Sequence, residues 1–205
     1  MRDTAQTTKE QLLGAAKEEF LKNGFQGASL RNIAKSVGLT TGAVYGYYSS
    51  KEALFDALVQ ESYEHFLSRY KNALAEFERI PSEKQPEMMG KISSLCLEEL
   101  LGFMYDNRDA FHLLLLCSAG TRYEFMLDEI VALEVEATHK YYKVLGRLGT
   151  PVPQIDSHLE HILVTGMMNA YFEMIIHDMP IKKALNYLAE LNGFYTAGWM
   201  KIMGQ

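Results

Sequence analysis

Residues 28–55 read Ala-Ser-Leu-Arg-Asn-Ile-Ala-Lys-Ser-Val-Gly-Leu-Thr-Thr-Gly-Ala-Val-Tyr-Gly-Tyr-Tyr-Ser-Ser-Lys-Glu-Ala-Leu-Phe. Apolar residues recur three and four positions apart in its first half, which is the spacing of one helix face, at Leu30, Ile33, Ala34 and Val37. Gly38 can adopt a positive φ after the last turn of that helix, and Thr40 or Thr41 can cap a second, shorter helix. The stretch therefore predicts two helices joined by a tight turn, which is a helix-turn-helix.

Two kinds of face are expected on this motif, which spans about residues 29–48. Ser29 is expected to cap the first helix, and Ala34 is small where the two helix backbones approach. The residues that we expect on the buried sides of the two helices are Ile33, Val37, Leu39, Val44, Tyr47 and Tyr48. The outward residues of the second helix are Thr41, Gly42, Ala43, Tyr45 and Gly46. This small, uncharged face suits close approach to base edges in a DNA major groove better than it suits solvation.

The stretch from Leu12 to Leu58 resembles the TetR family of bacterial transcriptional regulators. Residues 42–54, Gly-Ala-Val-Tyr-Gly-Tyr-Tyr-Ser-Ser-Lys-Glu-Ala-Leu, carry the resemblance through a Tyr-x-Tyr-aromatic-x-Ser-Lys-Glu pattern. The similar stretch covers roughly the first quarter to third of the chain. The resemblance implies an all-α protein of about nine helices, with a three-helix DNA-binding head and a larger helical body that binds a ligand and dimerises.

By motif position, the resemblance also implies which residues touch operator DNA. Contacts to base edges are implied for Arg31, Thr41, Gly42, Ala43 and Tyr45, and contacts to phosphates for Ser29, Thr40, Tyr47 and Lys51. Arginine can pair bidentately with guanine, and threonine and alanine methyls can meet a thymine methyl. Lys51 has no apolar reason for its place and offers a point charge to the DNA backbone. A packing role for Tyr47 stays equally open.

Gly46 departs from the family, whose other members often carry a larger side chain at this position. Because Gly42, Ala43 and Gly46 are all small, we expect Arg31 to carry much of the direct readout of bases. The shape of the operator is then expected to contribute to specificity as well.

The distribution of charge agrees with a DNA-binding head. The chain has 205 residues, 48% of them apolar, which is enough for a real hydrophobic core, and its net charge is −6. Residues 1–51 hold seven Lys and Arg against four acids, so this segment is +3 and the remainder is −9. A basic head on an acidic body attracts phosphate at one end. Scattered solvated charge is the alternative explanation.

Cysteine usage and hydropathy predict a soluble cytoplasmic protein. Cys96 and Cys117 lie in apolar stretches without the close spacing of a zinc or redox pair, so we expect buried free thiols. The first ten residues lack an apolar signal region, and no stretch approaches the ~20 continuous apolar residues that span a bilayer. We therefore expect no membrane partner.

Hydrophobic periodicity predicts helices throughout the chain. The first helix is expected to have an inner stripe of Leu12, Leu13, Ala16 and Phe20 and to end at Asn23-Gly24, with Phe25 folding back on it. A helix over 51–80 is expected to have Leu54, Phe55, Leu58, Phe66, Tyr70, Leu74 and Phe77 inward. Further helices are expected at about 87–106, 108–118, 122–148, 155–177 and 181–203, with a loop at 149–153.

These helices suggest two domains. We expect a helix-turn-helix DNA-binding domain at 1–50 and a helical ligand-binding and dimerisation domain at 51–205, linked by the helix over 51–80. A ligand in the body is expected to move the head only by shifting this linking helix.

The last two expected helices are apolar over more than one face, notably across residues 159–176. They are either central helices of one domain or helices with one face in an intersubunit surface. The resemblance favours the second interpretation, a homodimer through these two helices. Its two heads would meet half-sites about one DNA turn apart, ~34–36 Å.

The resemblance also implies a pocket for a small, mainly apolar or aromatic effector in the body. The lining residues that we expect are His65, Phe66, Arg69, Phe103, His112, Tyr123, Met168 and Phe172. A stripe of aromatic and methionine residues is also typical of an ordinary core.

Signatures of catalysis and metal binding are weak. His158 and His161, with Glu160 between them, have a spacing that can place two imidazoles on one helix face, but no third ligand is identifiable and a solvated helix start explains them. The sequence carries no phosphate loop, nucleophile elbow or metalloprotease motif. We expect no catalytic residue, no metal and no cofactor. The function hypotheses are a ligand-released dimeric repressor, a DNA-binding regulator without an effector, and an all-α enzyme or carrier.

Overall fold

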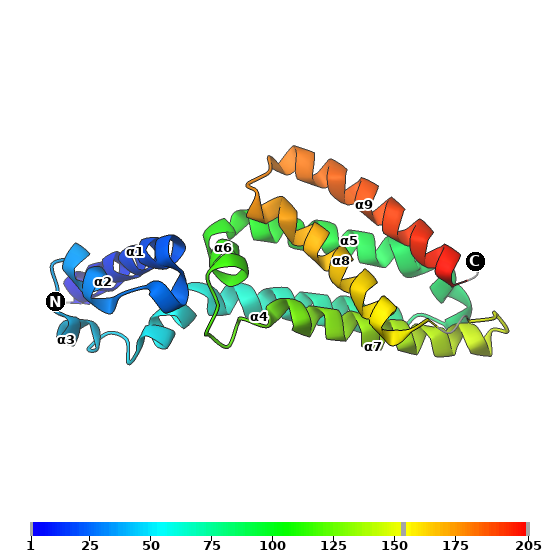
Figure 1. Ribbon diagram of the computed structural model, residues 1–205, viewed down its shortest axis with the longest axis horizontal. Coiled ribbons are helices and arrows are strands. Elements are labelled where there is room, and N and C mark those ends of the chain that lie inside the picture. The colour runs from blue at the N-terminus through cyan, green and yellow to red at the C-terminus, as the bar shows by residue number, and fades with distance from the viewer. Residues whose placement is uncertain (1, 153–154, 204–205) are drawn as a thin grey trace. The chain divides into compact units, whose positions relative to one another are not determined.

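A computed structural model describes residues 2–152 and 155–203, with side chains from Gln6 onward. The described residues form nine α-helices and one short 3-10 helix, with no strand, so the all-α fold is confirmed. In chain order (Figure 1) the helices are α1 (Arg2–Gly27), α2 (Leu30–Ser36), α3 (Thr41–Val44), α4 (Lys51–Glu78), η1 (Ser82–Lys84), α5 (Gln85–Asp106), α6 (Arg108–Leu116), α7 (Met126–Arg147), α8 (Ser157–Ile176) and α9 (Ile181–Ile202). None of the described helices is long and apolar enough to cross a bilayer.

The chain forms two compact units. Unit 1 contains Met1–His65 and Asn107–Phe125, and unit 2 contains Phe66–Asp106 and Met126–Gln205. The chain therefore passes between the units three times, once within α4, once between α5 and α6, and once before α7. The division into functional domains after residue 50 stays a prediction. The expectation that a ligand moves the head only by shifting α4 also stays a prediction, and the two other crossings are further covalent connections between the units.

Unit 1 is built on an aromatic cluster. Gly24 interrupts α1 with a φ of 66°, a conformation that glycine adopts without steric cost. The chain then turns back, and the ring of Phe25 lies 5.9 Å from that of Phe20 on α1 and 5.5 Å from that of Phe55 on α4. The expected end of the first helix and the return of Phe25 are thus confirmed.

The segment after α6 explains why unit 1 includes residues from the middle of the chain. The Phe25 N–H donates a hydrogen bond to the Cys117 carbonyl at 2.8 Å, and Lys17 on α1 pairs with Asp109 on α6 at 2.5 Å. Tyr123 is fully buried, with its ring 4.9 Å from that of Tyr63 on α4. The expected helix start at 122 is wrong, because residues 119–125 form turns around this buried tyrosine and α7 begins at Met126.

Unit 2 is a helical bundle in which α5 packs against α9 and α7 against α8 (Figure 1). Its core includes Phe66 on α4 and Phe172 on α8, whose ring centroids lie 5.8 Å apart. The Tyr171 hydroxyl, also on α8, donates to the Leu97 carbonyl on α5 at 2.8 Å. The first contact joins the second half of α4 to α8, and the second joins α8 to α5.

Both cysteines are buried free thiols, as expected. Cys96 lies on α5 in unit 2, and burial raises its pKa to about 11. Cys117 follows α6 in unit 1, and burial raises the pKa of its thiol as well. Neither thiol is a ready nucleophile at neutral pH, because the thiolate form is disfavoured.

The start of α8 is held by Asp156, whose carboxylate accepts hydrogen bonds from the N–H groups of His158 and Leu159. His158 and His161 are exposed, whereas Glu160 is buried and lies 2.6 Å from His139 on α7. Glu160 is thus directed away from the solvated side of the helix. Within the described part of the chain, no three metal-ligating side chains come together.

Candidate DNA-binding surface and ligand cavity

The helix-turn-helix has the geometry that its sequence predicts. Gly38 has a φ of 70° in the turn between α2 and α3, and the Leu39 N–H donates to the Ala34 carbonyl at 2.8 Å. Ile33, Ala34 and Val44 are each only 1% exposed. Small and branched side chains therefore hold the two short helices together, and the turn between them is closed by backbone hydrogen bonds.

The two helices are capped in different ways. Thr40 caps α3, since its hydroxyl oxygen accepts a hydrogen bond from the Ala43 N–H at 3.2 Å. The expectation that the Ser29 side chain caps α2 is wrong. The Glu19 carboxylate, carried by α1, accepts from the Ser29 N–H at 3.0 Å and from the Asn32 side chain at 3.2 Å. The hydrogen bond from Ser29 is the main reason why the pKa of Glu19 is lowered.

The outward face of α3 is partly exposed and uncharged. Gly42 and Gly46 are exposed, Tyr45 is 53% exposed, and Thr41 and Ala43 are half-buried. A Cβ atom at Gly46 would lie 3.2 Å from the Ala43 carbonyl oxygen, so a larger side chain there would be tightly placed. The chain's own backbone thus gives one reason for the glycine at this position.

The two neighbouring tyrosines that follow α3 differ in burial. Tyr47 is 37% exposed and Tyr48 is 8% exposed, so the expectation that Tyr47 is buried with the motif's core is wrong. Tyr48 fills that position, and the Lys9 ammonium lies 5.7 Å from the centre of its ring. Tyr47 is therefore accessible to a partner.

Arg31 and Lys35 place two cations on the exposed side of α2. Neither side chain has a hydrogen-bond or ion-pair partner among the residues that the structure describes. α2 also contacts α3, so Arg31 is carried by the same small motif as the outward face of α3. The motif therefore combines cationic groups on α2 with an uncharged outward face on α3.

Lys51 has a structural role that its sequence position did not reveal. Its ammonium donates hydrogen bonds to the backbone carbonyls of Phe25, Gln26 and Ala28, at 2.7, 3.3 and 3.2 Å. It also lies 4.5 Å from the centre of the Phe25 ring. An ammonium has three N–H donors, and all three are occupied. Lys51 thus has a structural role that was not expected, and the phosphate contact that the resemblance implies for it stays a prediction.

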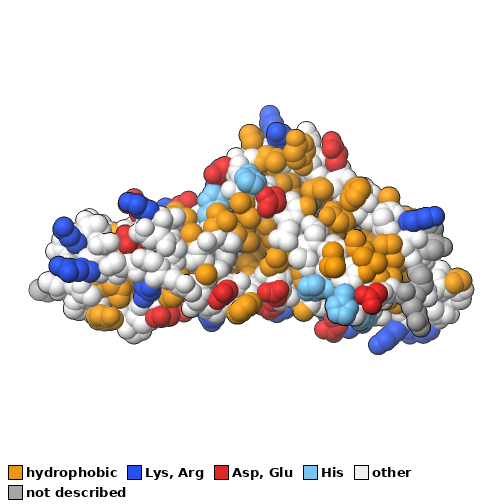
Figure 2. Space-filling view, viewed as in Figure 1, with side chains coloured by type: hydrophobic (Ala, Val, Ile, Leu, Met, Phe, Trp, Pro, Cys, Tyr) orange, Lys and Arg blue, Asp and Glu red, His pale blue; other side chains and the backbone are white. Residues whose placement is uncertain are grey.

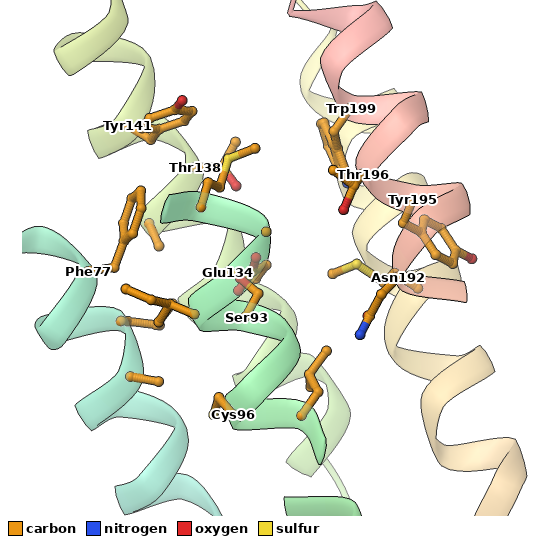
Figure 3. A pocket seen from close by; sticks show the side chains of 18 of the residues that line it. Phe77, Ser93, Cys96, Glu134, Thr138, Tyr141, Asn192, Tyr195, Thr196 and Trp199 are labelled. Atoms are coloured by element: carbon orange, nitrogen blue, oxygen red, sulfur yellow. The ribbon is translucent and has the colours of Figure 1, made fainter. Parts of the chain in front are cut away.

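Unit 2 encloses a cavity of about 130 Å³ among helices α4, α5, α7, α8 and α9 (Figure 3). Its lining residues are Tyr70, Ala73, Leu74, Phe77, Met89, Gly90, Ile92, Ser93, Cys96, Leu97, Glu134, Ala137, Thr138, Tyr141, Met167, Met168, Asn192, Tyr195, Thr196, Trp199 and Met203. Apolar and aromatic side chains dominate this lining, with a few polar groups among them. Such a composition is typical of a small-molecule site.

Glu134 is the ionisable acid of this lining. Its carboxylate accepts a hydrogen bond from the Tyr70 hydroxyl at 2.5 Å. Burial raises the pKa of Glu134, and the hydrogen bond from Tyr70 opposes that shift. Burial, and then the negative charge of Glu134, raise the pKa of Tyr70 well above its usual value. Desolvation thus dominates the electrostatics of this pair.

Of the eight residues expected to line a pocket, Met168 alone lines this cavity. Phe66 and Phe172 are buried core residues, Arg69 pairs with Glu99 at 2.8 Å, and Phe103 is half-buried outside the lining. His65, His112 and Tyr123 belong to unit 1. Their predicted role in ligand binding is not supported by this cavity.

Sequence reasoning missed the acid of the cavity, although a signal was present. Ile130, Glu134, Ala137 and Tyr141 follow one another at helical spacing on α7, so the glutamate interrupts an otherwise apolar or aromatic stripe. A charge on the inward face of a helix indicates either a partner or a site. The residues contributed by α9 carried no comparable signal.

The comparisons with known proteins agree with this description. The family model described as "Bacterial regulatory proteins, tetR family" matches residues 12–58. The HTH-type transcriptional regulator UidR of Escherichia coli K12 is 38% identical over 74 residues, which are 36% of this chain and 38% of UidR. The HTH-type transcriptional regulator TtgR of Pseudomonas putida is 35% identical over 63 residues, 31% of this chain and 30% of TtgR. The match thus spans less than two fifths of either relative.

Solved structures extend the similarity to the whole fold. A transcriptional regulator from Aquifex aeolicus VF5 matches with a TM-score of 0.55 and 22% identity, covering 89% of this chain and 96% of that one. FadR from Bacillus subtilis, solved with stearoyl-CoA, matches with a TM-score of 0.52 and 15% identity. The match covers 89% of this chain and 96% of FadR. Identities this low establish the fold alone. The relatives are named as transcriptional regulators, and the helix-turn-helix segment of this chain, within residues 12–58, matches the tetR family of bacterial regulatory proteins.

Proposed function

We propose that this protein is a DNA-binding regulator of transcription, acting as a dimeric repressor that a small molecule releases from its operator. The observation that carries the proposal is the helix-turn-helix of α2 and α3, with its uncharged outward face and the exposed Arg31, inside the segment that the family model matches. An exposed, small recognition face beside an arginine is suited to reading base edges in the major groove.

The proposed contacts follow the surface of unit 1. Base-edge contacts are proposed for Arg31, Thr41, Gly42, Ala43 and Tyr45, and phosphate contacts for Ser29, Thr40 and Tyr47. We omit Lys51, because its ammonium donors are occupied by backbone carbonyls. The phosphate attraction is instead assigned to the exposed cations of α2.

Dimerisation is supported by exposed apolar side chains on α8 and α9. Ile162 on α8 is 63% exposed and Phe194 on α9 is 71% exposed. Figure 2 shows hydrophobic side chains gathered over these two helices. A second copy that covers this face would remove it from water and pair two helix-turn-helix motifs about a twofold axis.

The cavity of unit 2 is proposed as the effector site. The C-terminal part of α4 contributes four residues to the lining of the cavity, Tyr70, Ala73, Leu74 and Phe77. The same helix continues without interruption to Lys51 in unit 1. A ligand that shifts α4 therefore acts on a helix shared by both units. The connections through α5 and α7 add further routes. Coupling of this kind must be reciprocal, so operator DNA weakens effector binding by the factor by which effector weakens operator binding.

The test is binding of the purified protein to its own upstream DNA, followed by fluorescence anisotropy at several salt concentrations. Sequence-specific binding that weakens with salt is expected of a regulator. Binding that is no tighter than to random DNA would favour the enzyme or carrier alternative. Specific binding that no cavity ligand releases would leave a regulator without an effector.

A further inference from the structure

The described residues that line the cavity in unit 2 include an acidic side chain but no basic one. Among the described residues that line it, Glu134 is the only carboxylate, and none is a lysine, arginine or histidine. The other titratable groups of the lining are the Cys96 thiol and tyrosine hydroxyls. When Glu134 is ionised, the lining therefore contains no cation to balance it.

The cations on either side of Tyr70 in the sequence lie outside the lining and have carboxylate partners. Arg69 pairs through its Nε with Glu99 at 2.8 Å, although its buried Nη1 has no hydrogen-bond partner, and Lys71 pairs with Glu129 at 2.9 Å. Lys140, further along α7, pairs with Glu78 at 2.7 Å. The Tyr70 hydroxyl donates a hydrogen bond to Glu134 but brings no charge. A partly buried carboxylate without a cation is costly, so a cationic ligand would offset part of the desolvation penalty of Glu134.

Aromatic side chains line the same cavity as this carboxylate. Figure 3 shows Glu134 near the middle of the labelled side chains, with Phe77 and Tyr141 on one side and Trp199 on the other in that view. Aromatic faces attract organic cations and also provide apolar contact for the body of a ligand. The lining thus combines one negative group with surfaces that suit an aromatic cation.

We propose that the cavity takes a monocationic ligand with an aromatic or apolar body, such as a protonated amine, whose nitrogen pairs with Glu134 and whose body contacts Phe77, Tyr141 and Trp199. That this ligand is also the effector rests on the proposed function. A carboxylate ligand is disfavoured, because the lining offers it no cation and Glu134 repels it.

The test uses three probes that share one aromatic body: 2-naphthylmethylammonium, 2-naphthylmethanol and 2-naphthoate. Isothermal titration calorimetry of each probe into the full-length protein at pH 7.5 is expected to rank their affinities ammonium, alcohol, carboxylate. In Glu134→Gln the ammonium is expected to lose on the order of 30-fold in affinity or more, because the charge that pairs with it is gone. The alcohol is expected to change by less than about threefold.

Two variants keep the comparison interpretable. Glu136→Gln removes the same charge from an exposed position on α7 outside the lining and is expected to leave all three affinities unchanged. Tyr70→Phe removes the hydroxyl that donates to Glu134 while retaining the ring, and it is expected to retain ammonium binding. If circular dichroism shows that Glu134→Gln does not fold, the ranking of the three probes on the wild-type protein tests whether the cavity prefers a cation.

Three results would overturn the proposal: equal affinities for the three probes, tighter binding of the naphthoate, or no binding of the ammonium at millimolar concentration. A different result would refute the proposed role of the ligand as the effector. Binding of the ammonium that depends on Glu134 but leaves operator binding unchanged would support the ligand class and refute the effector role. Release of operator by the naphthoate would support the effector role and refute the proposed ligand class.

Discussion

Lys51 allows a sharp test of whether its side chain serves the fold or the DNA. In Lys51→Met the aliphatic stem is largely retained, and only the ammonium with its three hydrogen bonds to carbonyls of residues 25, 26 and 28 is lost. A hydrogen bond to a charged group contributes about 1.5–3 kcal/mol, and the three bonds share one ammonium, so their energies do not add. Part of the loss is recovered where water reaches the carbonyls of exposed residues. We expect the free energy of unfolding to fall by about 1.5–3 kcal/mol.

The assay is urea unfolding followed by circular dichroism at 222 nm, with operator binding measured at several salt concentrations. The matched control is Lys35→Met, which removes an exposed cation of unit 1 and is expected to change stability by less than about 0.5 kcal/mol. An unchanged unfolding midpoint in Lys51→Met, with a salt slope reduced by about two units per dimer, would refute the structural role and restore a phosphate contact.

Three other predictions concern the remaining contacts. Arg31→Ala should cost about 1–3 kcal/mol on operator DNA and less on random DNA, and equal losses on both would show that Arg31 touches only phosphate. Because the Ser29 N–H lowers the pKa of Glu19 below 4.5, Glu19 stabilises the fold above that pH, and the effect is lost as pH falls through the lowered pKa. Glu19→Ala should therefore destabilise by about 1 kcal/mol at pH 7 in thermal melts, with the difference narrowing below pH 4.5, and a constant difference would contradict this. Ile162→Glu with Phe194→Glu should convert a dimer to a monomer in light scattering, whereas Phe125→Glu, an exposed apolar position of unit 1, should not.

The sequence by itself determined the helix-turn-helix. The turn at Gly38, the cap at Thr40 and the buried sides of α2 and α3 depend on neighbours only a few residues away. Interactions of this range repeat wherever the same residue pattern occurs, so the family motif and the local helices could be predicted together. The break in α1 at Gly24 is a local feature of the same kind.

Tertiary structure alone decided which distant groups meet. Glu19 caps α2 from ten residues away, and Lys51 closes the end of α1 from more than twenty residues away. The cavity requires five helices, and its acid, Glu134, meets Tyr70 across 64 positions of sequence. Periodicity indicates which face of a helix is buried but not which helix covers it, because many partners satisfy the same apolar stripe. The choice among them is made by how the side chains of all five helices fill one volume.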